Sequence, residues 1–305
     1  MSRRVQYTEI GGPEVLHIVE VEPPHPGPGE VRVQVRAAGL NPLDAKIFQG
    51  RPTASPHKIE FPMGNGADFA GVIDELGADV TAFGLADEVF GGLIYHAQAD
   101  FVVVSPDRLF LKPPSLTMEQ AAALDTVGRT AAASVASLSL GPEDIVLVSA
   151  AAGGVGVLAG QLAKRTGAVV IGTASEANHE FLHSLGVHPV EYGAGLVQAV
   201  RAISPNGVTA ALDNHGRETV EAALELGAPP NRVNTIADYG APADFGATMV
   251  GSRFASSQDI RELAALIAAG EIVLPIDSVF PLERVGDAYE RLIAGHVRGK
   301  IVLEL

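Results

Sequence analysis

Residues 145–175 read IVLVSAAAGGVGVLAGQLAKRTGAVVIGTAS, and this stretch decides the fold. It opens with an apolar run, 145–149, of the kind that forms a buried strand, and then passes through a glycine-rich turn into an alanine-rich helical pattern. A second apolar run, 169–173, follows the helix. Strand, helix and strand in this order predict a parallel βαβ unit with a right-handed crossover.

The glycine-rich turn after the first strand has the spacing of a phosphate-binding loop. Compared with GxGxxG, Ala151 replaces the first glycine, Gly153 and Gly156 are the second and third, and Gly154 is an additional small residue. Gly153 lets the backbone approach a pyrophosphate, and Gly156 lets the helix pack closely on the strand. We therefore expect Gly153, Gly154, Val155 and Gly156 to bind a dinucleotide at the start of the helix. A turn that merely connects a strand to a helix is the alternative, and the βαβ context argues against it.

The chain before about residue 115 is β-rich. Glycine and proline separate short strand-like runs there, as in PPHPGPGE (23–30), which precedes the alternating VRVQVRA (31–37). We predict a compact antiparallel or barrel-like domain in this part of the chain. Further strands are expected at 71–75, 88–90 and 100–104.

From Thr117 onward, helices alternate with short apolar strands, which predicts a doubly wound parallel sheet with a cleft at the strand carboxyl ends. Thr117 is the expected N-cap of a helix that runs to about Leu124 and is interrupted at Thr126–Gly128. After Ser252 the pattern alone does not decide whether the tail continues this sheet or returns to the β-rich domain. Strands are predicted at 145–149, 169–173, 189–191, 210–212, 233–236, 276–280 and 300–303, and helices at 155–166, 177–185, 196–202, 218–226, 257–269 and 282–293.

The composition narrows the classes of function. With 21 basic and 36 acidic residues, the 305-residue chain carries a net charge of −15, which disfavours nucleic acid as a partner. The absence of cysteine excludes disulfides, thiolate nucleophiles, iron–sulfur clusters and cysteine-containing zinc sites. The nine histidines form no HExxH pair, so we assign no metal. We expect a cytoplasmic protein, because the amino terminus lacks an apolar signal core and no apolar run reaches the roughly 18 residues of a membrane helix.

Five separated segments carry a resemblance to a known family: GLNPLDAKIFQG (39–50), GNGADFAGVIDELGADVTAF (64–83), TVGRTAAAS (126–134), 148–175 and RGKIVLEL (298–305). On these segments, nearly the whole chain resembles the zinc-independent quinone oxidoreductase branch of the medium-chain dehydrogenase/reductase superfamily. The resemblance implies a GroES-like catalytic domain formed by residues 1–115 with 270–305, and a Rossmann NADPH-binding domain formed by 116–269. It therefore favours return of the tail to the β-rich domain.

The resemblance also bears on zinc. Zinc-dependent relatives bind their catalytic zinc through a cysteine in the first of these segments and a His-Glu pair in the second. The matching stretches here read GLNPLD and GADFAG, so Asn41 and Asp68 are not a ligand set. A zinc alcohol dehydrogenase is therefore not expected.

The nicotinamide end of the site is implied by the same resemblance. Asn41, Asp44 and Lys46 are the expected catalytic residues, and Thr130 is expected to contact the nicotinamide. Many members have an aromatic residue where this chain has Lys46. Lys46 could equally be a solvated lysine on the surface. Asn41 before Pro42 also has a simpler reading as a turn former, and Thr130 as a helix hydroxyl.

The end of the second parallel strand predicts the choice of cofactor. Strand 169–173 is followed by Ala174 and Ser175, so no carboxylate occupies the place that accepts the ribose 2′-hydroxyl of NADH, and we favour NADPH. Glu176 is the competing reading, although an acidic residue at a helix start is also common for dipole reasons. Relatives bind the 2′-phosphate at the positions of Ser175, His179 and Tyr192, with lysine frequent in place of His179.

Residues at other strand ends complete the predicted site. Asn214, Ile236 and Ala237 follow predicted strands and are expected to contact the cofactor. Tyr95 and His96 are candidates for lining the substrate cleft, with ordinary loop residues as the alternative. The loops 51–60 and 93–99 are expected to shape the pocket.

These predictions lead to an NADPH-dependent oxidoreductase that transfers a hydride to a quinone or conjugated carbonyl without zinc. The alternatives are an enoyl or alkenal reductase, and a non-catalytic NADPH-binding sensor or structural protein. The expected partner is a small quinone or enone, with neither nucleic acid nor membrane. A homodimer is expected, in which a strand at Ala247–Gly251 would pair across a two-fold axis.

Overall fold

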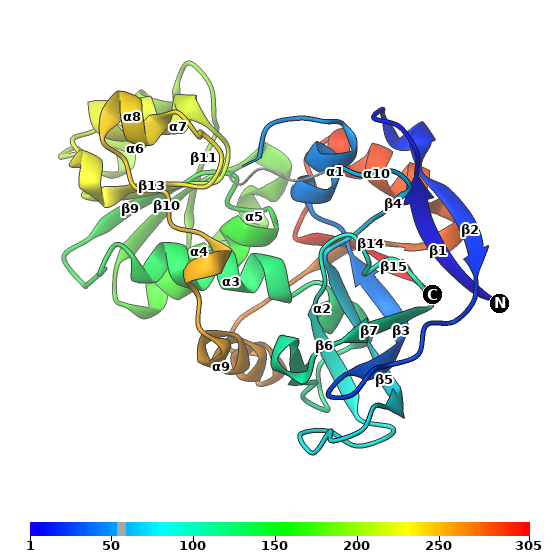
Figure 1. Ribbon diagram of the computed structural model, residues 1–305. Coiled ribbons are helices and arrows are strands. Elements are labelled where there is room, and N and C mark those ends of the chain that lie inside the picture. The colour runs from blue at the N-terminus through cyan, green and yellow to red at the C-terminus, as the bar shows by residue number, and fades with distance from the viewer. Residues whose placement is uncertain (54–58) are drawn as a thin grey trace. The chain divides into compact units, whose positions relative to one another are not determined.

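The computed structural model describes residues 1–53 and 59–305, which form two compact units (Figure 1). One unit contains Met1–Thr126, Arg261–Glu271 and Pro275–Leu305, and the other contains Val127–Ile260 and Ile272–Leu274. The functional domains expected at 1–115 with 270–305 and at 116–269 stay a prediction. Of the pocket loop expected at 51–60, residues 54–58 lie outside the described part of the chain.

The first unit is built on a seven-stranded sheet in which the carboxyl-terminal strand lies beside an amino-terminal one. The strand order is β14-β15-β3-β5-β6-β8, and β7 also pairs with β3. The last strand, β15, runs antiparallel to β3, so the tail returns to the β-rich unit. The strands are β3 (Val31–Gly39), β5 (Asp68–Leu76), β6 (Glu88–Gly92), β7 (Phe101–Val104), β8 (Leu109–Leu111), β14 (Ile276–Pro281) and β15 (Lys300–Glu304).

Burial along β3 explains its alternating sequence. Val31, Val33 and Val35 are buried, and the polar residues between them are partly exposed, as the period of two predicts. At its carboxyl end the strand is buried on both faces, because helix α2 (Met118–Ala122) packs against it. Gly39 permits this approach, since a Cβ there would lie 2.4 Å from the carbonyl oxygen of Ala122.

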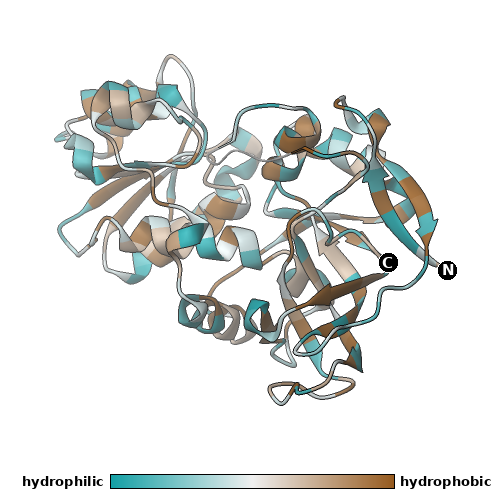
Figure 2. Cartoon of the chain, viewed as in Figure 1, coloured by the Kyte–Doolittle hydropathy of each residue, from teal (hydrophilic) through white to brown (hydrophobic). Residues whose placement is uncertain are grey.

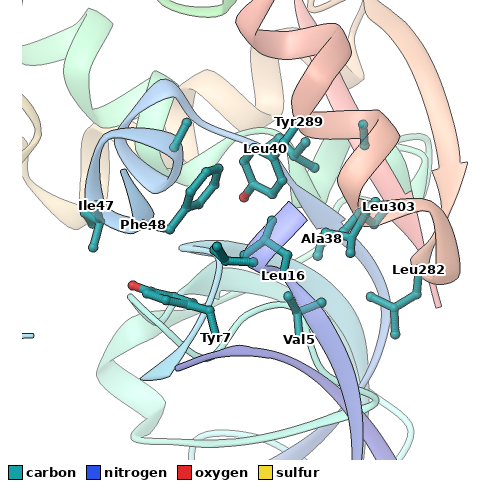
Figure 3. Packing of buried hydrophobic residues seen from close by; sticks show 14 of the residues in the cluster. Val5, Tyr7, Leu16, Ala38, Leu40, Ile47, Phe48, Leu282, Tyr289 and Leu303 are labelled. Atoms are coloured by element: carbon teal, nitrogen blue, oxygen red, sulfur yellow. The ribbon is translucent and has the colours of Figure 1, made fainter. Parts of the chain in front are cut away.

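A smaller sheet and two helices enclose an apolar cluster of this unit. The sheet has the order β2-β1-β4, and it packs with α1 (Pro42–Phe48) and α10 (Val285–Ile293) around a shared core (Figure 3). The Phe48 and Tyr289 rings meet edge to face with centroids 5.1 Å apart, which joins α1 to α10. The strands are β1 (Ser2–Tyr7), β2 (His17–Val21) and β4 (Met63–Gly64).

The second unit contains a five-stranded, all-parallel sheet with the order β11-β10-β9-β12-β13. Figure 2 shows its strands as hydrophobic, as expected for a sheet buried on both faces. The chain order reverses direction between β9 and β12, which makes their carboxyl ends the topological switch point of the sheet. The strands are β9 (Ile145–Val148), β10 (Val169–Thr173), β11 (His188–Val190), β12 (Ala210–Asp213) and β13 (Val233–Thr235).

Each strand of this unit is followed in the sequence by a helix. The predicted α/β class, with a Rossmann-like sheet and a separate β-rich sheet, is confirmed. In the described part of the chain, no helix combines the length and apolar character needed to cross a membrane. The helices are α3 (Asp125–Ala136), which begins in the first unit, α4 (Gly154–Arg165), α5 (His179–Ser184), α6 (Leu196–Ile203), α7 (Arg217–Glu225) and α8 (Ala241–Phe245). Helix α9 (Ser257–Ala268) begins in this unit, and its residues from Arg261 onward belong to the first unit.

Two local predictions were wrong. Thr117 caps α2 as expected, but α3 runs through Thr126–Gly128, and the interruption lies earlier, at 123–124. The backbone N–H of Thr126 lies in the first turn of α3, where the helix itself supplies no acceptor, and it donates to Asp68. Ala247–Gly251 is not a strand, since only Thr248 forms a bridge to β13. The strand that we expected to pair across a two-fold axis is therefore not formed at these residues.

The close approach of α2 to β3 yields a stability prediction. Gly39→Ala forces the two backbones apart, and we expect it to lower the free energy of unfolding by about 1–3 kcal/mol in urea denaturation. Gly141→Ala is the matched control, because nothing lies within 4 Å of a Cβ built there. Equal effects of the two substitutions would contradict the packing explanation.

Candidate functional site

A buried polar network lies inside the β-rich unit, where four of the segments that carry the family resemblance meet. Seven of its side chains are at most 3% exposed, a burial that polar groups tolerate only when they are hydrogen-bonded. The network comprises Asn41, Asp44, Asn65, Asp68, Gln98, Tyr289 and Lys300, together with Thr126 at its edge.

Asn41 is held from three directions at the junction of β3 and α1. Its backbone N–H donates to Asp44 Oδ2 at 2.9 Å, as in a capping box, and Pro42 occupies the first helical position. The side-chain Nδ2 donates to Asp68 Oδ2 at 2.9 Å, and Oδ1 accepts from Lys300 Nζ at 2.5 Å. Its amide therefore has a defined orientation.

Asp68, at the start of β5, is fixed in turn by the first turn of α3. Its Oδ1 accepts from Thr126 N at 3.1 Å and from Thr126 Oγ1 at 2.5 Å. The ammonium of Lys300 lies 3.9 Å from Asp68 Oδ2. The carboxylate thus joins α3, Asn41 and the carboxyl-terminal strand.

Tyr289 extends the network from Asp44 to two amides. Its hydroxyl donates to Asp44 Oδ2 at 3.2 Å and accepts from Asn65 Nδ2 at 3.0 Å and Gln98 Nε2 at 2.8 Å. Asn65 Nδ2 also lies 2.9 Å from Gln98 Oε1. Tyr289 therefore connects α10 to the polar network by hydrogen bonds, and to the apolar core by the packing of its ring.

The electrostatic balance of the network is uneven, because two carboxyl groups share one ammonium. Burial raises the pKa of Asp44 to about 7, and Asp68 adds to the shift, while the N–H of Asn41, the Lys300 charge and Tyr289 oppose it. Burial also lowers the pKa of Lys300 from its usual value, against the attraction of Asp68 and Asp44. The pKa of Tyr289 is raised well above its usual value by burial and by Asp44.

The glycine loop lies at the switch point of the parallel sheet. Gly153 is the N-cap of α4, and Ala150 before it adopts a positive φ of 47°. A Cβ on Gly156 would lie 2.2 Å from the carbonyl oxygen of Ala150, so only glycine permits this contact of helix and loop. A Cβ on Gly153 would meet only Ala150 O, at 3.3 Å, which leaves its face of the loop open to a ligand.

Asp213 fixes the neighbouring strand ends. This residue, 1% exposed, accepts from Ser149 Oγ at 3.0 Å and from Thr235 Oγ1 at 2.6 Å. Two backbone N–H groups, of His215 and Gly216, also donate to it. It therefore joins the carboxyl ends of β9, β12 and β13.

The residues predicted after these strands lie along the same edge of the sheet. Asn214 Nδ2 donates to Ser149 O at 2.9 Å, which places it beside the start of the glycine loop. Ile236 and Ala237 directly follow β13, and Thr235 Oγ1 accepts from the N–H of Ala237. All three residues are half-buried, and Thr130 lies on α3 at 8% exposure.

The residues predicted for the 2′-phosphate follow two adjacent strands. Ser175 and His179 come after β10, and Tyr192 comes after β11, which pairs with β10. His179 Nε2 lies 3.3 Å from the carbonyl oxygen of Ala174, and Tyr192 is 50% exposed. Glu176 is exposed at the start of a short 3₁₀ helix.

The remaining candidates lie in the β-rich unit. Tyr95 and His96 line a cavity of about 430 Å³ together with Arg4 and Gln98. Burial and the charge of Arg4 lower the pKa of His96. Lys46 lies half-buried on α1. Across residues 1–53 and 59–305, no three or more His, Asp or Glu side chains gather so that they could hold a metal ion.

Sequence reasoning missed Asn65, Gln98, Tyr289, Lys300 and Asp213 as members of these networks. A signal for Lys300 existed, because a single lysine opens the otherwise apolar strand KIVL. Asp213 likewise ends the apolar strand AALD. A charged residue at the end of a strand that is expected to be buried indicates a partner, but the sequence does not say which.

Comparison with known proteins gives the family. Residues 27–113 match the alcohol dehydrogenase GroES-like domain, and residues 185–303 match the zinc-binding dehydrogenase family. Quinone oxidoreductase of Mus musculus is 30% identical, with 100% of this chain and 98% of the relative covered. The structure of quinone oxidoreductase from Coxiella burnetii has a TM-score of 0.91 at 31% identity, covering 100% of this chain and 99% of that one. A structure described as an NAD-dependent alcohol dehydrogenase has a TM-score of 0.88 at 30% identity, with 99% of each chain covered.

The chain therefore belongs to the zinc-independent quinone oxidoreductase branch of the medium-chain dehydrogenase/reductase superfamily. It is an oxidoreductase, similar to quinone oxidoreductases, of a family that uses a nicotinamide cofactor. Its relatives imply a small-molecule substrate.

The raised pKa of Asp44 predicts how stability depends on pH. The folded state holds a proton on Asp44 up to about pH 7, whereas the unfolded state releases it near 3.8, so this residue makes stability fall as pH rises between these values. We expect Asp44→Asn to remove this contribution, since an amide mimics the protonated acid. One pKa unit corresponds to about 1.4 kcal/mol, so the free energy of unfolding of the wild type should fall by at least about 1 kcal/mol more than that of the variant between pH 5 and pH 7.5.

Urea denaturation at the two pH values makes this measurement. Asp287→Asn is the control, because its side chain is 49% exposed and makes a surface ion pair with Arg284. Parallel pH profiles for Asp44→Asn and the wild type would contradict the assignment of a proton to Asp44.

Proposed function

We propose that this enzyme transfers a hydride from NADPH to a quinone or a conjugated carbonyl without zinc. The observation that carries the proposal is the glycine loop at the switch point of the parallel sheet, where open α/β sheets bind their ligands. The cofactor supplies the hydride, and the protein supplies binding and orientation.

The loop fits a dinucleotide on its own geometry. Gly153 presents an open backbone face at the start of the 12-residue helix α4, and Gly156 lets that helix begin directly against the loop. N–H groups at a helix start and the positive end of its dipole favour a pyrophosphate. The residues we propose to contact the cofactor are Asn41, Thr130, Gly153, Gly154, Val155, Gly156, Ser175, His179, Tyr192, Asn214, Ile236 and Ala237.

Preference for NADPH is supported by the end of β10. The strand stops at Thr173, the next residue is a buried alanine, and the hydroxyl of Ser175 follows. These residues place no negative charge against a 2′-phosphate, and His179 and Tyr192 offer hydrogen bonds to it. Glu176, exposed beyond the strand end, is the residue that would instead favour NADH.

Independence from zinc is supported by the chemistry around Asn41 and Asp68. The Asn41 oxygen accepts from the ammonium of Lys300 at 2.5 Å, and the same ammonium lies 3.9 Å from Asp68. A cation that belongs to the protein thus already lies beside both side chains. Asn41 and Asp44 then act by orienting the nicotinamide, and Lys46, Tyr95 and His96 are the candidates for contacts with the substrate.

The proposed reaction needs no strong protein acid when the substrate is a quinone. The quinone accepts the hydride and then a proton from solvent, and becomes the hydroquinone. An enone accepts the hydride at its β-carbon and a proton at its α-carbon. Rate enhancement then comes mainly from orientation in a site that excludes water. An enoyl or alkenal reductase and a non-catalytic NADPH-binding protein are the alternative functions.

The cofactor and substrate classes are tested together. Fluorescence titration should give a dissociation constant for NADPH at least tenfold lower than that for NADH, because only NADPH carries the 2′-phosphate. Oxidation of NADPH, followed by its absorbance, should occur with 1,4-benzoquinone or 9,10-phenanthrenequinone. Turnover with a simple enone alone would favour the alkenal reductase, and tight binding without any turnover would favour the non-catalytic protein.

The glycine loop is tested by a pair of substitutions in one segment. We expect Gly153→Ala to weaken NADPH binding about tenfold or more, because the added methyl group blocks the approach of the pyrophosphate. Gly160→Ala is the matched control, since a Cβ there meets only side-chain atoms, at 3.6 Å or more. Unchanged affinity in Gly153→Ala would contradict the assignment of the loop.

A further inference from the structure

We infer that Lys300 is a positioning residue for the reaction, and that its buried ammonium, with Asp68, fixes the orientation of the Asn41 side-chain amide. This inference rests on the proposed function, in which Asn41 contacts the nicotinamide. Lys300 lies 259 residues from Asn41 in the sequence, at the start of β15. Its role is indirect, because it acts through Asn41.

The ammonium is placed by backbone pairing. Strand β15 pairs with β3, and the N–H of Leu40 donates to Ile301 O at 3.0 Å. Lys300 Nζ then donates to Leu40 O at 2.6 Å and to Asn41 Oδ1 at 2.5 Å. The side chain is 3% exposed, and it is directed at the residues that end β3 and begin α1.

Charge decides which way the Asn41 amide faces. Its oxygen points to the ammonium of Lys300, and its NH₂ group points to the carboxylate of Asp68. The flipped amide would place NH₂ against the ammonium and oxygen against the carboxylate, so both contacts would become repulsive. Asp68 accepts one Nδ2 hydrogen, and the second is then oriented for an acceptor on the cofactor or substrate.

Stability alone does not explain a lysine at this position. The next three residues of β15, Ile301, Val302 and Leu303, are completely buried, and an apolar side chain at 300 would continue that core. A buried ion pair is often no more stabilising than apolar residues of similar volume, because both charges lose their hydration. Orientation of Asn41 is a property that an apolar residue cannot supply.

The ammonium also sets the charge of the whole network. The charged or titratable groups that face Asp44 are Asp68 from β5, Lys300 from β15, Tyr289 from α10 and Tyr7 from β1. Lys300 is the cation among them. Its loss leaves two buried carboxyl groups without a counter-charge, which favours a proton on one of them.

The chain offers a sharp test because it contains no cysteine. Lys300→Cys introduces a single thiol, which is alkylated in the unfolded state before refolding. Treatment with 2-bromoethylamine restores an ammonium at nearly the length of lysine, whereas bromoethane gives a neutral side chain. Lys300→Met, expressed directly, replaces the neutral form if the alkylated protein does not refold.

Lys112→Cys, treated in the same two ways, is the matched control. The Lys112 side chain is 5% exposed, donates to Leu116 O at 2.7 Å and pairs with Glu88, but it contacts none of the network residues. Both of its adducts should therefore have equal kcat values, although their stabilities can differ.

We expect the neutral side chain at 300 to lower kcat about 100-fold, the cost of a misplaced reacting group, with KM for NADPH changed less than threefold. The aminoethyl adduct should recover kcat to within about threefold of the wild type. Equal kcat values for the aminoethyl and ethyl adducts would overturn the inference.

A measurement without turnover separates this inference from the proposed function. In protein labelled with ¹⁵N-asparagine, the side-chain amide protons of Asn41 should exchange with solvent at least tenfold faster in the neutral variant than in the aminoethyl adduct. If the wild type turns over neither quinone nor enone, the proposed function fails, and amide exchange alone decides whether Lys300 fixes Asn41. Equal exchange rates would then reject the role of Lys300.

Discussion

The pairing of β15 with β3 is the interaction on which the β-rich unit depends. It brings Lys300 beneath the junction of β3 and α1, where its ammonium reaches the carbonyl oxygen of Leu40 and the side chain of Asn41. The same pairing carries α10 back to the amino-terminal core, where Tyr289 packs on Phe48 and donates to Asp44. One strand pair thus brings together the apolar core of the unit and places the Lys300 ammonium in its polar network.

The two units organise a buried carboxylate in different ways. Asp213 is surrounded by hydroxyl and backbone N–H donors, which satisfy its carboxylate oxygens with hydrogen bonds. Asp68 and Asp44 have fewer donors each and share the ammonium of Lys300. The first arrangement holds strand ends rigidly beside the glycine loop, and the second leaves a proton near Asp44 that responds to pH around neutrality.

Local sequence patterns predicted the elements but not their partners. The strands, the alternating burial of 31–37 and the glycine loop follow from periods and turn residues within a few positions, so they could be predicted from sequence. The resemblance to known enzymes pointed to Asn41 and Asp44, but local patterns gave no indication that Lys300 and Tyr289 hold them. Those contacts join residues about 250 positions apart, and the local pattern of a single sequence does not indicate which residues meet at that separation. The break wrongly predicted at Thr126–Gly128 has the same origin, because the acceptor for the backbone N–H of Thr126 is Asp68, which comes from a strand distant in the sequence.

The late position of Lys300 has a consequence for synthesis. Amino-terminal segments leave the ribosome first, and β3, α1 and β5 are complete long before residue 300 is added. Until then the carboxyl groups of Asp44 and Asp68 have no ammonium beside them, and β3 lacks the partner strand at its carboxyl end. A nascent or prematurely terminated chain therefore lacks both the ammonium and the strand that pairs with β3, so the polar network reaches its final state only after β15 has been synthesised.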